Sequence, residues 1–175
     1  SDFASKCHHL RLRVGDSPRI HLATIQINAI PRVMSCPPLQ HEMSEALGGL
    51  AELVGFDLNS EITSDRSVAL TLYWRALVRT DIDYVIFTHI LDGSGRLVAQ
   101  HDSIPAGGQR ATSGWVAGEY IVDHHEMEWL ASDFAGPIEI EVGLYDPITG
   151  QRLLSATGDS RLVLADGIIV RQKQK

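Results

Sequence analysis

The feature that most constrains the fold of this chain is a two-residue alternation of apolar and polar side chains along most of its length. Successive side chains of a β-strand point to opposite faces, so this period predicts strands with one buried face. The segment SVALTLYWRAL is a clear case. Its predicted buried face consists of Val68, Leu70, Leu72, Trp74 and Ala76. The segment PIEIEVGLYD repeats the pattern, with Ile138, Ile140, Val142 and Leu144 opposite Glu139, Glu141 and Tyr145.

Turn residues separate the alternating segments. YVIFTHIL, apolar on both faces, is typical of a central strand, and DGSG at Asp92–Gly95 predicts a hairpin to RLVAQHD because glycine tolerates positive φ. DPITG at Asp146–Gly150 is a second turn. Further strand candidates are HLRLRV, RIHLATIQINAI, LAELVGFDL, QRLLSA and SRLVLAD. Eight or nine short strands predict an all-β fold, an antiparallel two-sheet β-sandwich of immunoglobulin-like type, with a jelly roll as the alternative.

Helical spacing is weak. In LQHEMSEALGGL, the residues Leu39, Met43, Ala46 and Leu47 would share one face of a helix that Gly48 ends, so we expect at most one short helix. The predicted organisation is one domain, in which residues 1–47 form N-terminal edge strands and a connecting loop. Residues 48–170 form the sandwich core, and the tail RQKQK occupies 171–175.

Composition excludes several functions. The formal charge is −7 and basic residues are scattered, which argues against binding nucleic acid. No apolar run approaches the roughly 20 residues of a transmembrane helix, and no signal peptide is evident. Two cysteines, Cys7 and Cys36, do not make a disulfide framework, and whether they pair stays open.

The segment VDHHEMEW, residues 122–129, has the composition of a metal or active site. In a strand, Asp123, His125, Met127 and Trp129 fall on one face, and His124, Glu126 and Glu128 on the other. Adjacent histidines on a strand diverge, whereas metal ligands must converge. We therefore interpret His125 as a partly buried structural histidine and predict no metal and no cofactor.

A catalytic triad is also not indicated. His89 and His101 lie on the two arms of the predicted Asp92–Gly95 hairpin, so a cross-strand contact is open to them, but no Gly-x-Ser-x-Gly elbow occurs. We predict no catalytic residue and no enzymatic activity.

The loop from Ile104 to Trp115 is the best candidate for ligand binding, because loops on a rigid scaffold often carry function. Gln109 and Arg110 offer hydrogen-bond donors, and Trp115 offers a flat apolar plate for a sugar ring. The alternative is that Trp115 turns inward and anchors the loop.

Five segments together carry a family resemblance: LAELVGFDL, LTLYWRAL, DYVIFTHILDGSGRLVAQHDSIP, TSGWVAGEYIVD and IEVGLYDPITGQRL. From Gly48 onward the chain resembles the C-terminal soluble domain of bacterial multi-pass membrane proteins of the dolichyl-phosphate-mannose mannosyltransferase-like class. The resemblance implies an extracytoplasmic β-sandwich and assigns no catalytic residue, because the transferase chemistry of such proteins belongs to their membrane-embedded part. The chain departs from these relatives after Val122 and Asp123. Relatives usually have a proline that ends this strand, whereas this chain has the segment EWLASDFAG.

The function predicted is a non-catalytic extracytoplasmic accessory module of a glycosyltransferase-like membrane protein. Its expected partner is a glycan, or the membrane-embedded part of the same polypeptide. The alternative is a free-standing hydrolase or metal-dependent enzyme that uses the histidine and carboxylate clusters.

Overall fold

The computed structural model describes residues 30–59, 67–130 and 134–170. The chain divides into two units between Arg32 and Val33, and all the described strands belong to the second, Val33–Lys175. The candidate strand HLRLRV, nearly all of RIHLATIQINAI and the tail RQKQK lie outside the described residues. The predicted boundary between residues 47 and 48 stays a prediction.

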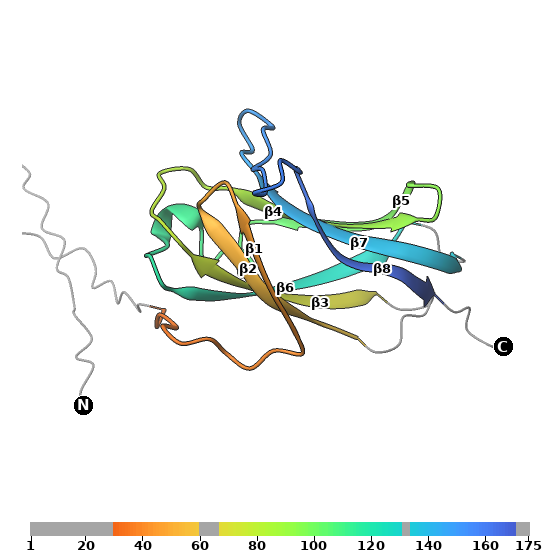
Figure 1. Cartoon of the computed structure of the whole chain (residues 1–175), viewed down its shortest axis with the longest axis horizontal. Helices are drawn as coiled ribbons and strands as arrows, with labels where there is room; N and C mark the ends of the chain where they lie inside the picture. Colours follow the sequence, from red (N-terminus) through yellow and green to blue (C-terminus); the bar gives the residue numbers. More distant parts are fainter. Residues whose placement is uncertain (1–29, 60–66, 131–133, 171–175) are drawn as a thin grey trace, which may run out of the picture. The chain divides into compact units, whose positions relative to one another are not determined.

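Eight antiparallel strands form one sheet in the order β1-β2-β3-β6-β5-β4-β7-β8 (Figure 1). The run β7-β4-β5-β6 is a Greek key, because three consecutive strands lie side by side and the fourth returns beside the first. The strands are β1 (His41–Leu47), β2 (Ala51–Leu58), β3 (Val68–Ala76), β4 (Val85–Asp92), β5 (Leu97–Ser103), β6 (Tyr120–Trp129), β7 (Gly136–Tyr145) and β8 (Leu162–Val170).

The sheet curls until it is nearly barrel-shaped. The end of β1 meets the segment that precedes β8, where Leu47 bridges Ser155 and the Gly48 N–H donates to the Leu154 carbonyl at 2.8 Å. The prediction of an all-β antiparallel fold is therefore confirmed.

The interior of this curled sheet consists of the predicted alternating faces. All five residues of the predicted β3 face are at most 1% exposed. The four apolar residues of the β7 face are equally buried, and they pack in the same core cluster. A register shift of one residue would turn these side chains to the outside, so the core fixes the strand register.

The expectation of a short helix near Leu39–Leu50 is wrong, because His41–Leu47 forms the edge strand β1. Pairing with β2 decides the conformation, with a register irregularity between Glu42 and Glu45. Gly55 on β2 permits the close approach, since a Cβ there would lie 2.4 Å from the His41 carbonyl oxygen. The described residues contain one short 3-10 helix, η1 (Thr112–Gly114), and no helix long and apolar enough to cross a membrane.

Candidate functional site: a hollow beside the β4–β5 turn

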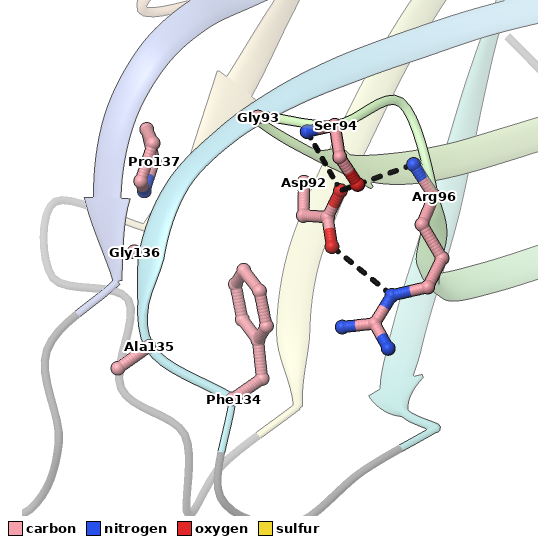
Figure 2. Close-up of a pocket in the computed structure, with 8 residues that line it drawn as sticks. All are labelled: Asp92, Gly93, Ser94, Arg96, Phe134, Ala135, Gly136 and Pro137. Carbon is pink, nitrogen blue, oxygen red and sulfur yellow. Dashed lines mark hydrogen bonds and ion pairs between the residues drawn. The ribbon is translucent and has the colours of Figure 1, made fainter.

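A shallow hollow of about 520 Å³ lies where the β4–β5 turn faces the start of β7. Figure 2 shows its lining, in which the turn stands opposite the segment that leads into β7. A second hollow of about 380 Å³ shares Asp92, Gly93 and Pro137 with the first and extends to Glu139 and Arg161. The first hollow is lined by Asp92, Gly93, Ser94, Arg96, Phe134, Ala135, Gly136 and Pro137.

Asp92 shapes the turn. Its Oδ1 accepts hydrogen bonds from the Ser94 N–H at 2.9 Å, the Ser94 hydroxyl at 2.6 Å and the Arg96 N–H at 3.0 Å. Its Oδ2 accepts from Arg96 Nε at 3.0 Å. The Ser94 and Arg96 donors together lower the pKa of Asp92 to about 2. The carboxylate is thus engaged in the hydrogen bonds of the turn, a common role for aspartate at this position.

Arg96 and Phe134 supply the chemistry of the hollow. The Arg96 side chain is 71% exposed and binds Asp92 through Nε, which leaves its two Nη groups facing solvent. Phe134 is half-buried and stacks on Trp129, with ring centroids 5.4 Å apart. In Figure 2 the Phe134 ring and the Arg96 guanidinium both project into the space between the turn and β7. The hollow therefore combines an apolar surface with cationic donors.

The outer face beyond the second hollow carries a cluster of paired charges. On β4, His89 lies between Asp102 and Glu141, with Nε2 3.6 Å from Asp102 and Nδ1 3.3 Å from Glu141. Arg161 pairs with both Glu141 and Glu139. His89 thus links β4 to Asp102 on β5 and to Glu141 on β7, and Arg161 adds ion pairs to the two glutamates of β7.

Farther along the same face lies the aromatic ring of Phe87, which contacts two neighbouring side chains. The Arg152 guanidinium lies 4.1 Å from the centre of its ring, a cation–π contact. Tyr145 is a further aromatic neighbour, and its hydroxyl donates to Asp102 at 3.3 Å. Sequence reasoning missed this group because its members come from separate strands.

The three residues predicted to bind a ligand have different environments. Gln109 is exposed, and a contact between it and a ligand stays a prediction. Arg110 forms an ion pair with Glu119, which is 1% exposed, and Trp115 is also 1% exposed. The Trp115 indole N–H donates to the Arg110 carbonyl at 2.7 Å. Trp115 thus has the inward orientation of the alternative, and its ring offers no open face.

The two faces predicted for VDHHEMEW are confirmed. On β6, Asp123, His125 and Met127 are buried, while His124, Glu126 and Glu128 are exposed. Sequence reasoning did not identify the partner of His125. His101 on β5 places its Nδ1 2.9 Å from the Nδ1 of His125, and His125 Nε2 donates to Asp123 at 2.6 Å.

The contact left open between His89 and His101 does not form. His101 pairs across β4 with Thr88, whereas His89 pairs with Gln100, so the two histidines point to opposite faces of the sheet. Within residues 30–59, 67–130 and 134–170, no three His, Cys, Asp or Glu side chains converge in the way a metal site requires.

The fold and the hollow together define a small, nearly closed Greek-key β module with an open surface site. No protein-family model matches the sequence, and no curated protein matches it. Among solved structures, the C-terminal domain of Wzt is similar, with a TM-score of 0.53 over 79% of this chain and 83% of that one. The two sequences are 16% identical, so the similarity concerns the fold alone.

Proposed function

We propose that this chain is a non-catalytic accessory module that binds a glycan in the hollow beside the β4–β5 turn. The observation that carries the proposal is the arrangement of Phe134 and Arg96. An aromatic ring with an apolar face lies next to exposed guanidinium donors in one open depression. Ligand sites in proteins typically combine apolar surface with a few polar groups that fix orientation.

The chemistry of the hollow suits a sugar. The C–H face of a pyranose packs on an aromatic ring, while its hydroxyls accept hydrogen bonds from Arg96 Nη. Asp92 takes no part, because its oxygens already accept four hydrogen bonds from the turn. The shallow, open form of the hollow favours a segment of a longer glycan that extends over the second hollow towards Glu139 and Arg161.

A binding role rather than catalysis is supported by the state of the candidate catalytic groups. Asp123 and His125 are buried on the inner face of the curled sheet and are hydrogen-bonded to each other, and neither lines the hollow. On the outer face, Glu141 forms an ion pair with Arg161 and a hydrogen bond with His89. The alternative of a hydrolase or metal enzyme has no comparable observation in its favour.

We also propose that the curled sheet acts as two layers of a sandwich, β1-β2-β3-β6 and β5-β4-β7-β8. In this order β6 lies between β3 and β5, which differs from the immunoglobulin-like arrangement. In the immunoglobulin order the sixth strand would lie between the third and the seventh.

The resemblance of five segments to glycosyltransferase-associated domains supports a parent protein of that class and an extracytoplasmic location. The similar solved structure is itself a C-terminal domain, that is, part of a longer protein, which is in keeping with an accessory role. Translation of the coding sequence on either side of residues 1–175 tests this point. A parent without membrane spans would contradict it.

Binding is tested by screening the purified chain against a glycan array and then measuring the affinity of the best neutral oligosaccharide by calorimetry. Phe134→Ala and Arg96→Ala should each weaken binding at least tenfold. Matched controls are Leu130→Ala and Arg79→Ala, which remove an exposed apolar and an exposed cationic side chain outside the hollow. No binding to any glycan, or equal loss in the controls, would overturn the proposal.

A further inference from the structure

Strands β5 and β6 join the two halves of the sheet through a short backbone ladder. The ladder contains two residue pairs, Ala99 with Trp129 and Gln100 with Glu128. The Leu130 N–H extends it by one hydrogen bond to the Val98 carbonyl, at 2.9 Å. Beyond Gln100, in the described part of both strands, side chains make the connection in place of the backbone. We call this stretch the seam.

The seam is a chain of three hydrogen bonds between buried or half-buried groups. His101 Nδ1 lies 2.9 Å from His125 Nδ1, and His125 Nε2 donates to Asp123 Oδ2 at 2.6 Å. The other oxygen of Asp123 accepts the Ala106 N–H at 2.7 Å, just after the end of β5. Ala106 has a φ of 54°, a left-handed conformation that alanine rarely adopts, so this bond helps to hold it.

The hydrogen bonds of the seam depend on how many protons the His101 and His125 imidazoles carry. Because His125 donates from Nε2 to Asp123, one further proton is available to the contact between the two Nδ1 atoms. That proton makes one nitrogen the donor and the other the acceptor. One added proton leaves this bond in place, because the charged ring donates to the neutral one. If both rings are charged, each carries an Nδ1–H, and the contact has two donors and no acceptor. The contact therefore exists only while one of the two imidazoles is neutral.

We propose that the seam is an acid-sensitive junction: positive charge on both His101 and His125 breaks the Nδ1–Nδ1 contact and separates β5 from β6 beyond Gln100. His101 is the half-buried partner and turns towards solvent, while His125 stays with Asp123. The separated seam exposes the polar interior around Thr88, whose hydroxyl lies 3.5 Å from His125 Nδ1.

The surroundings of the pair contain few other charges. Asp123 faces it from β6, and Asp102 is the neighbour of His101 on β5. From β4 the facing group is the neutral Thr88, and the residues paired with His125 and Asp123 across β3 are Leu70 and Leu72. Burial, and then the nearby His125, lower the pKa of His101, although Asp123 and Asp102 oppose this.

Nuclear magnetic resonance of the ¹⁵N-labelled chain from pH 8 to pH 5 tests the proposal. The ring ¹⁵N signals of His101 and His125 should show one Nδ1 as donor and the other as acceptor at pH 8, and this contact should be lost on acidification. The backbone amides of His101, Asp102 and Ala106 should shift when the contact is lost. An Nδ1–Nδ1 contact that persists to pH 5, or seam amides that do not move when it is lost, would overturn the proposal.

Two variants separate the seam from general acid effects. His101→Gln keeps a donor for His125 but cannot take a proton, so the acid-dependent shift of the seam amides should disappear. His124→Gln is the matched control. His124 is the exposed neighbour whose Nδ1 lies 2.9 Å from Thr71 Oγ1, and its loss should leave the transition unchanged. An unaltered transition in His101→Gln contradicts the proposal, and if that variant does not fold, the wild-type titration still decides.

Discussion

At the scale of single residues, Trp115 holds the loop between β5 and β6 to the core. Its ring is buried with the core cluster, and its indole N–H donates to the Arg110 carbonyl within the same loop. Arg110 in turn forms an ion pair with the buried Glu119. Packing of the Trp115 ring, one hydrogen bond and one ion pair therefore stabilise the position of the loop.

Trp115→Ala should lower the free energy of unfolding by about 3–5 kcal/mol, because a large buried ring is replaced by a cavity. Trp115→Phe keeps most of the packing but loses one hydrogen bond and some buried volume. Its cost should be smaller, about 1 kcal/mol for the hydrogen bond and a further loss for the volume. Urea denaturation measures both. A stable Trp115→Ala variant that fails to bind glycan would show instead that Trp115 contacts the ligand.

Gly143 on β7 makes room for Phe87. A Cβ at position 143 would lie 2.5 Å from the Phe87 ring, which Arg152 covers on the outer face. Gly143→Ala should therefore destabilise the fold by about 1–3 kcal/mol, as overpacking does. Gly114→Ala is the control, since a Cβ there meets nothing within 4 Å. Equal melting temperatures for the two variants would mean that the ring moves aside freely.

At the scale of elements, the seam between β5 and β6 differs from the other strand pairs. β3 and β6 pair over eight residues, from Val68–Met127 to Arg75–Tyr120, whereas β5 and β6 share two pairs. The seam depends on titratable side chains, so its contribution to stability depends on pH.

Stability should fall on acidification because of His101. Its pKa is lowered in the folded state, so the unfolded state binds more protons below the ordinary value of 6.5. The contribution is complete above pH 6.5 and is lost as the pH falls through the lowered pKa. Urea denaturation at pH 7.5 and pH 5.5 measures it by comparing the wild type with His101→Gln. An equal loss in both proteins would exclude His101 as the cause.

Alternation predicted the strands that have one buried face, because hydrophobic burial alone fixes their conformation. The apolar faces predicted for β3 and β7 are buried, but Tyr73 and Glu141 on the opposite faces are buried as well. On β6 the predicted inner face is buried except for the half-buried Trp129. The edge strand β1 was missed because most of its side chains are exposed, and its conformation comes from pairing with β2. Local spacing of Leu39 and Met43 carries no information about such a partner.

At the scale of the whole molecule, strand order decides which surfaces form. The turn at Asp92–Gly95 was predictable from its residues, but the hollow beside it was not. Phe134 and Pro137 reach the turn because β7 pairs with β4, a contact between distant parts of the sequence. His101 and His125 meet because β6 returns beside β5. Sequence patterns predict the strands, whereas the pairing of strands in the folded protein brings the side chains of each site together.

The hollow beside the β4–β5 turn is the proposed glycan site. The most direct measurement is to titrate the best array-selected neutral oligosaccharide into ¹⁵N-labelled protein and map the amide shifts. The largest shifts should fall on Gly93, Ser94, Arg96 and Gly136, with weaker shifts towards Glu139. Shifts centred instead on Gln109 and the rest of the Ile104–Trp115 loop, or no shifts at saturating oligosaccharide, would contradict the proposal.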